Sequence, residues 1–269
     1  MADQASSFIA FTRSELERVG LVRVEQDGLV FFRGGHGPRT IVLLHGVNDQ
    51  AGTWSSIVPA LVDRATLIVP DLAGHGESAP AEGPLPMETI LDGLHQVVEG
   101  VDRFTLVGNS MGGWVSMLYT LAHPKRVEQL ILEDASGMAW PLGVPLFPKD
   151  REEAIAVLRA VHGPAMELPD WMIDAMLARA ISAPGTRVVQ AGLMNHLLDG
   201  LLEQITAPTA MIWGRHDGLL PIAYAETLQQ KIAGSTLQVI EDAAHIPHRQ
   251  QPERFLTCLL ETFSANAPA

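Results

Sequence analysis

The sequence predicts an α/β protein built on a mostly parallel, eight-stranded sheet with helices on both faces. Short apolar or β-branched runs recur along the chain, and amphipathic helical stretches separate several of them. The composition is that of a globular protein: the 269 residues are 47% hydrophobic and 18% charged. Such a chain can bury a large core, and general disorder is excluded.

The chain begins with a predicted helix and hairpin. Residues 7–19 have an amphipathic pattern that ends at Gly20, a residue that commonly follows the last turn of a helix. Two apolar runs, residues 21–24 and 29–32, flank an Asp-Gly pair that is typical of a tight turn between antiparallel strands. We therefore expect an antiparallel pair before the parallel part of the sheet.

Six further runs lack the alternation of polar and apolar residues and are typical of strands buried on both faces. They are residues 40–44, 66–69, 104–107, 129–132, 209–213 and 236–240. Helical patterns are found at residues 57–62, 87–98, 111–122, 223–232 and 253–263. This alternation predicts parallel strands joined by helices.

Residues 137–204 interrupt the alternation, because they contain no strand pattern. The segment holds five of the chain's 10 methionines and two tryptophans, and prolines divide it into short helices. We expect a helical cap inserted above the strand ends, with residues 1–136 and 205–269 forming the core.

Charge and cysteine content exclude several classes of protein. The formal net charge is −13 with no basic stripe, so nucleic-acid binding is not expected. A single cysteine, Cys258, excludes an internal disulfide and a cysteine-rich zinc site. The sequence has neither a signal-peptide pattern nor an apolar run of about 20 residues, so we expect a cytoplasmic protein without integral membrane contact, as a monomer or homodimer.

One segment combines a strand, a turn and a helix around a serine. Ser110 lies within Gly-Asn-Ser-Met-Gly, between an apolar run and a helical pattern. Glycines at these two positions allow the close backbone approach that a strained strand-to-helix turn requires, and the turn exposes the serine at a helix N-terminus. The alternative is that Ser110 merely caps the helix.

A nucleophilic serine needs a base, and the base needs a carboxylate that fixes its tautomer. Asp217 follows the seventh predicted strand, and His245 follows the eighth. Since parallel strands place their sites at their carboxyl ends, the sequence predicts a catalytic triad of Ser110, Asp217 and His245.

Taken together, these motifs resemble the α/β-hydrolase fold family, and in particular its serine esterases and monoacylglycerol-lipase-like members. The resemblance is carried by His45-Gly46 with Trp54, residues 71–78, the serine turn, residues 213–217 and Ala244-His245. It implies that Ser110 is the nucleophile, His245 the general base and then acid, and Asp217 the orienting acid. It also implies an oxyanion hole formed by the backbone N–H groups of Val47 and Met111.

Other residues compete for these roles. Asp134, after the sixth strand, is an alternative triad acid, and His248 is an alternative base. We expect Asp71 and His75 to shape a loop beside the site, and Cys258 to pack on the last helix. Trp54 and Trp114 are interpreted as packing residues.

We expect hydrolysis of neutral carboxylic esters with short to medium acyl chains, without cofactor or metal. The Gly-Asn-Ser-Met-Gly turn is also similar to that of meta-cleavage-product C–C hydrolases, which remain an alternative. Those enzymes use an arginine of the insertion, for which the sequence offers Arg151, Arg159, Arg179 and Arg187. A receptor-like module with a vestigial triad is a second alternative. The expected pocket residues are Asn109, Met138, Trp140 and Ile246.

Overall fold

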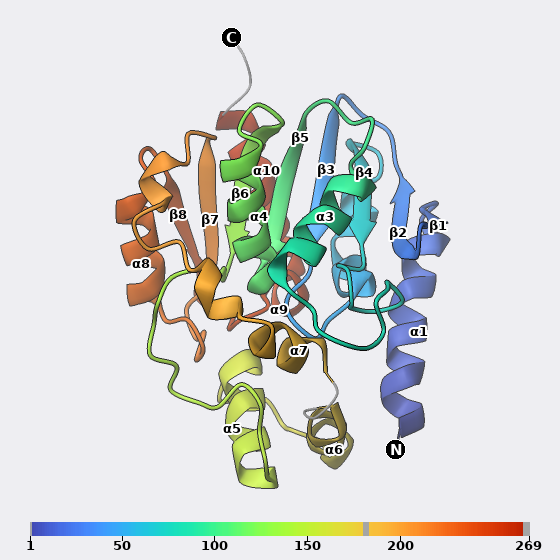
Figure 1. The fold of residues 1–269 in the computed structure, drawn as a ribbon, viewed down its shortest axis with the longest axis vertical. Helices are drawn as coiled ribbons and strands as arrows, with labels where there is room; N and C mark the ends of the chain where they lie inside the picture. Colours follow the sequence, from blue (N-terminus) through green and yellow to red (C-terminus); the bar gives the residue numbers. More distant parts are fainter. Residues whose placement is uncertain (1, 180–182, 266–269) are drawn as a thin grey trace.

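The computed structural model describes residues 2–179 and 183–265. An eight-stranded sheet runs through the molecule in the order β1-β2-β4-β3-β5-β6-β7-β8 (Figure 1). The strands are β1 (Val22–Gln26), β2 (Leu29–Gly34), β3 (Arg39–Leu44), β4 (Ala65–Pro70), β5 (Phe104–Asn109), β6 (Val127–Glu133), β7 (Thr209–Gly214) and β8 (Thr236–Ile240).

The sheet is mixed and mostly parallel, as the sequence predicts. β1 and β2 form an antiparallel hairpin, β2 pairs antiparallel with β4, and the strands from β4 to β8 are parallel to their neighbours. The hairpin turn places Asp27 at φ 50° and Gly28 at φ 80°, the conformation that an Asp-Gly turn favours. All eight predicted runs are strands, and the α/β fold class is confirmed.

The prediction of two buried faces is wrong for β8. This strand is the last in the sheet order, and its burial pattern is half-exposed up to Ile240. An edge strand has a neighbour on one side only, so residues that look like a core strand in sequence remain partly open to water.

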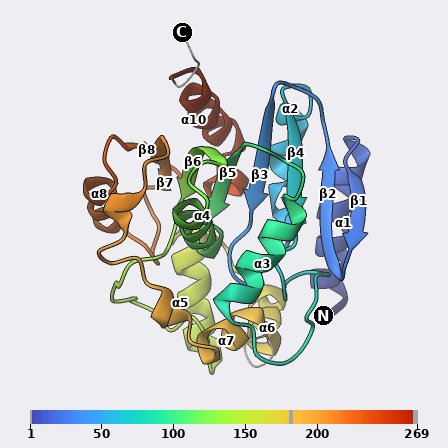
Figure 2. The same ribbon diagram turned by 45° about the horizontal axis from the view of Figure 1, so that its top comes forward.

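Alternate side chains of the central strands enter two separate cores. Ile41 and Leu43 of β3 pack on one face of the sheet, whereas Val42 and Leu44 pack on the other. Turning the molecule shows helices on both sides of the sheet, with α3 and α4 in front (Figure 2). This arrangement explains why the strands read as continuous apolar runs.

The described α-helices of the core agree with the predicted helical stretches, apart from α1 and the short α9, which was not predicted. Helix α1 begins at Ala2, so the predicted start at residue 7 was wrong. It packs against α6 of the insertion, a tertiary contact that no local pattern reveals. The helices of the core are α1 (Ala2–Arg18), α2 (Val58–Leu61), α3 (Met87–Val97), α4 (Met111–Ala122), α8 (Ile222–Lys231), α9 (Pro247–Gln250) and α10 (Pro252–Ala265), with the 3-10 turn η1 (Ala51–Ser56).

Helical elements connect β6 to β7, and within the described part of this connection there is no strand. They are α5 (Arg151–His162), α6 (Asp170–Arg179), α7 (Pro184–Gln190), η2 (Leu193–His196) and η3 (Leu202–Gln204). In Figure 1, α5, α6 and α7 lie below the sheet, beside α9 and the N-terminal end of α1. That end of the sheet is where the parallel strands finish and where the predicted site residues lie.

Candidate active site

Ser110 lies in a strained turn between β5 and α4. It has φ 52° and ψ −117°, a region that non-glycine residues adopt at a cost of about 1–3 kcal/mol. Both neighbouring glycines are required sterically. A Cβ atom at Gly108 would lie 2.4 Å from the carbonyl oxygen of Gly112, and a Cβ atom at Gly112 would lie 2.3 Å from that of Leu44. The turn therefore presents the serine side chain at the head of α4, as the sequence predicts.

Asp217 and His245 form a buried pair at the ends of β7 and β8. Nδ1 of His245 lies 2.8 Å from Oδ2 of Asp217, and the two residues are 5% and 4% exposed. The other oxygen of Asp217 accepts the N–H groups of Leu219 and Leu220 at 2.8 and 3.0 Å. A proton on Nδ1 would point at the carboxylate and would leave Nε2 as a proton acceptor, which is the tautomer that a general base requires.

The backbone of His245 is held from two sides. The side-chain amide of Asn109 donates to the His245 carbonyl at 3.0 Å, and the His245 N–H donates to the carbonyl of Val161 at 3.1 Å. Asn109 precedes the serine, and Val161 belongs to α5 of the insertion. The imidazole is thus positioned by both the serine turn and the insertion.

A second carboxyl group, that of Asp134, lies beside Asp217. It is fully buried and accepts the N–H of Gly214 at 3.1 Å. Burial, together with the neighbouring Asp217 carboxylate, raises the pKa of Asp134 well above its usual range. Because Nδ1 of His245 bonds to Asp217, the geometry favours Asp217 over Asp134 as the triad acid.

The two residues expected to form the oxyanion hole line the same cavity as Ser110. Val47 follows His45-Gly46 after β3, and Met111 is the first residue of α4; both line the cavity. Within the part of the chain that the structure describes, neither N–H donates to another protein group. Unpaired N–H groups beside a nucleophile are what an oxyanion hole requires.

His248 does not lie in this cavity. It is fully buried, its Nδ1 lies 2.8 Å from Glu133, its Nε2 lies 3.0 Å from Thr53, and its ring packs on Trp54 with centroids 4.2 Å apart. The geometry therefore assigns His248 and Trp54 a packing role. Trp114 combines two environments, since it donates to the carbonyl of His196 and also lines the cavity.

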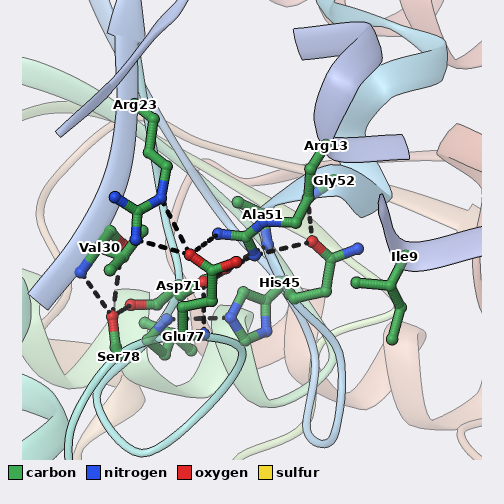
Figure 3. Close-up of polar contacts among 12 residues, drawn as sticks. Ile9, Arg13, Arg23, Val30, His45, Ala51, Gly52, Asp71, Glu77 and Ser78 are labelled. Atoms are coloured by element: carbon green, nitrogen blue, oxygen red, sulfur yellow. Dashed lines mark hydrogen bonds and ion pairs between the residues drawn. The ribbon is translucent and has the colours of Figure 1, made fainter. Parts of the chain in front are cut away.

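Asp71 organises the loops beside the site, as Figure 3 shows. Its carboxylate pairs with Arg13 at 2.8 Å and accepts the N–H groups of Ala51 and Glu77, each at 2.8 Å. His75 is also buried, and burial together with nearby His45 lowers its pKa to about 3. Asp71 thus joins α1 and two loops, and His75 packs within its own loop, where its Nδ1 lies 3.1 Å from the carbonyl of Ala73.

Cys258 is half-buried against the core between α10 and the sheet. Burial raises the pKa of its thiol, which disfavours the reactive thiolate. This environment does not suit a nucleophile.

A cavity of about 460 Å³ opens at the carboxyl ends of the strands. It is lined by Ser110 and His245, and its walls include all four residues expected in the pocket: Asn109, Met138, Trp140 and Ile246. The lining is mainly apolar, which suits an uncharged organic substrate.

The sequence reasoning missed two parts of the cavity wall. His162, at the end of α5, lines the cavity, and burial lowers its pKa to about 4, so it is neutral at physiological pH. One face of α1 also lines the cavity. The amphipathic pattern of α1 shows in the sequence that one face of this helix is buried. The sequence around it does not indicate whether that face lines a cavity or packs on the core.

Arginines of the insertion are absent from the cavity wall among the described side chains. Arg151 pairs with Asp170 and Asp174, and Arg187 donates to carbonyl groups of the loop at residues 74–83. Arg159 is not part of the wall either, and the side chain of Arg179 lies outside the described residues. The arginine that does line the cavity is Arg249, four residues after His245.

Residues 41–257 match the model of the "Alpha/beta hydrolase family". The chain belongs to this family. The resemblance inferred from its motifs is confirmed, and the fold is the eight-stranded α/β-hydrolase fold.

Three relatives are 24–29% identical to this chain over the aligned residues. An uncharacterized protein from Mycobacterium tuberculosis is 29% identical, over 87% of this chain and 78% of its own. A pimeloyl-[acyl-carrier protein] methyl ester esterase from Nitrosomonas europaea is 28% identical, over 83% and 95%. Human monoacylglycerol lipase ABHD6 is 24% identical, over 86% and 77%.

Solved structures have the same fold. A membrane phospholipase A, described as a bacterial virulence factor, superposes with a TM-score of 0.83 at 25% identity, covering 98% of this chain and 93% of that one. A meta-cleavage product hydrolase from Pseudomonas fluorescens gives a TM-score of 0.74 at 21% identity, covering 91% and 97%. In the described part of this hydrolase, no helix has the length and apolar character needed to cross a membrane.

Proposed function

We propose that this hydrolase is a serine carboxylesterase that cleaves neutral esters of short to medium acyl chains. The observation that carries the proposal is that His245, paired with the buried Asp217, lines one mainly apolar cavity together with the strained Ser110. An esterase and a lipase among the relatives support the same class of reaction.

The mechanism follows from the roles proposed for these side chains. Ser110 attacks the ester carbonyl while Nε2 of His245 takes the hydroxyl proton, and Asp217 stabilises the imidazolium that forms. The N–H groups of Val47 and Met111 stabilise the oxyanion, each by about 2.7–4 kcal/mol. The alcohol leaves with the proton from His245, and water, activated by the same imidazole, releases the acid from Ser110.

The surroundings fit this reaction. The insertion, with proposed limits 137–204, covers the cavity and holds the backbone of His245 through Val161. We further propose a cytoplasmic enzyme, monomeric or homodimeric, that requires neither cofactor nor metal. Asp134, Asp217 and His245 are the described side chains close enough to share a metal ion. In the proposed mechanism, however, Nδ1 of His245 remains bonded to Asp217.

Hydrolysis of nitrophenyl esters by wild type and Ser110→Ala tests the proposal. The variant is expected to lose activity by about 10⁶-fold, because nucleophile and base act as a unit. Turnover in EDTA is expected to be unchanged. If Ser110→Ala retained near-wild-type hydrolysis, the esterase mechanism would be excluded.

Cleavage of a ring-fission product is the second candidate, because meta-cleavage product hydrolases share the fold. The same assay should include one such dienoic acid and one lactone. We expect fast ester cleavage and slow cleavage of the acid, since no described arginine of the insertion reaches the cavity. The reverse ranking would establish C–C hydrolysis. Turnover far below about 1 s⁻¹ on every substrate would instead indicate a receptor-like module.

A further inference from the structure

One face of α1 forms part of the cavity wall. The lining residues of this helix are Ala5, Phe8, Ile9 and Thr12. Their spacing of three and four residues places them on a single stripe along the helix. α1 also lies outside residues 41–257, the segment that matches the family. The stripe therefore lies outside the segment that defines the family match.

A buried ion pair fixes α1 against the loops of the site (Figure 3). Arg13 follows the last lining residue and is 7% exposed. Its guanidinium bonds to both oxygens of Asp71 at 2.8 and 3.1 Å, and to Oε1 of Gln50 at 3.3 Å. Asp71 in turn accepts the N–H of Ala51. Because this network joins α1 to the segment that follows Val47, the lining stripe has a fixed position relative to the proposed oxyanion hole.

The other end of α1 meets the insertion. α1 packs against α6, and both helices lie at the lower end of the molecule in Figure 1. The residues of α6 that line the cavity are Trp171, Met172, Ala175 and Met176. The two helices together give one mainly apolar wall, to which α6 contributes Met172 and Met176.

Phe8 lies at the edge of this wall. Its side chain lines the cavity and yet the residue is 42% exposed. The guanidinium of Arg249 lies 5.3 Å from the centre of its ring, and Arg249 is also part of the wall. The pair closes the cavity between α1 and the segment that carries His245. Ile9, the next residue, is less exposed than Phe8 and lies further inside.

We propose that α1 determines acyl-chain specificity: its Phe8 and Ile9, in the cavity wall, contact the distal methylene groups of the bound acyl chain. The proposal rests on the esterase function proposed above. A fixed helix wall limits how many methylene groups fit, and Phe8 sets where the chain emerges into solvent.

The test compares Ile9→Trp, Phe8→Ala and the matched control Phe11→Ala on nitrophenyl acetate, butyrate, octanoate and dodecanoate. Phe11 lies on the same helix, is 60% exposed and is not part of the wall. Ile9→Trp should lower kcat/KM for octanoate and dodecanoate at least about 10-fold more than it lowers kcat/KM for acetate, since each misfitted methylene costs about 10-fold or more. Phe8→Ala should raise the ratio of dodecanoate to octanoate cleavage, and Phe11→Ala should match wild type.

The outcomes separate this proposal from the esterase proposal. If all three variants keep the wild-type chain-length profile while Ser110→Ala abolishes acetate cleavage, the role of α1 is wrong and the esterase function stands. If the wild type cleaves no ester, calorimetry of octanol binding to the Ser110→Ala protein decides the role of α1. Ile9→Trp in that background should weaken octanol binding at least about 5-fold and Phe11→Ala should not; equal affinities would overturn the proposal.

Discussion

The strand ends of the core and the helical insertion contribute opposite kinds of surface to the same cavity. The core side contributes buried polar groups held by hydrogen bonds, such as those that join Asp217 to His245, Leu219 and Leu220. The insertion side is apolar and partly open, with Met194 59% exposed. Catalysis requires reacting groups held in one fixed geometry. An apolar substrate chain, in contrast, can be bound by flexible side chains such as those of methionine. We therefore expect substitutions on the core side and on the insertion side to differ in their effects on kcat and on the free energy of unfolding.

Among these comparisons, the largest effect on kcat is expected for the two neighbouring carboxylates of the core. Asp217 and Asp134 lie side by side but are expected to have different roles. Asp217→Asn should lower kcat by about 10⁴-fold, because the amide stabilises the wrong tautomer of His245. Asp134→Asn is the matched control, since it makes the same change beside Asp217; it should leave kcat within about 10-fold. Steady-state kinetics on nitrophenyl butyrate measures both. The opposite ranking would make Asp134 the triad acid.

The backbone N–H of Val47 is the proposed oxyanion donor, so activity should depend on this N–H group and not on the side chain at position 47. Val47→Pro removes the N–H and should lower kcat about 10²–10³-fold. Val47→Ala keeps the N–H and should change kcat by less than about 3-fold. Thermal unfolding of both variants checks that they remain folded. Equal losses of kcat would exclude this N–H from the oxyanion hole.

Alanine substitutions at one glycine of the core and one glycine of the insertion compare how tightly the two regions are packed. Gly112→Ala should lower the free energy of unfolding by about 1–3 kcal/mol or more, because the new Cβ atom would lie 2.3 Å from the carbonyl oxygen of Leu44. Gly143, in the insertion, has no atom within 4 Å of an added Cβ. Gly143→Ala should change the free energy of unfolding by less than about 0.5 kcal/mol. Urea denaturation tests both; similar values would mean that the insertion is packed as tightly as the core.

The smallest effect concerns stability and pH. The pKa of Asp134 is raised from 3.8 in the folded protein, so between pH 4 and the raised pKa the unfolded chain loses this proton and the folded protein keeps it. The contribution of Asp134 to stability therefore falls as the pH rises through this range. Asp134→Asn has no such dependence and should be more stable than wild type at pH 7, with the difference shrinking towards pH 4.

Melting temperatures of the two proteins from pH 4 to pH 8 measure this dependence. A variant that is less stable than wild type at pH 7, by a margin that grows with pH, would show that Asp134 is ionised in the folded protein. That result would contradict the raised pKa of Asp134.

Local patterns in the sequence are enough to predict the strands, the serine turn and the order of the proposed triad. Apolar runs predict strands, glycines at 108 and 112 predict the turn, and parallel strands bring their carboxyl ends to one edge of the sheet. For that reason residues as far apart in the chain as Ser110 and His245 can be assigned to one site from the order of the strands alone.

The remaining features depend on tertiary packing. The start of α1 depends on its contact with α6, the half-exposure of β8 on its place at the sheet edge, and the role of His248 on its burial beside Glu133. The contribution of Phe8 and Ile9 to the cavity likewise depends on how α1 lies across the strand ends. An amphipathic stripe looks the same in sequence whether it faces a core, a cavity or a neighbouring helix, because periodicity records that a face is buried and not what covers it.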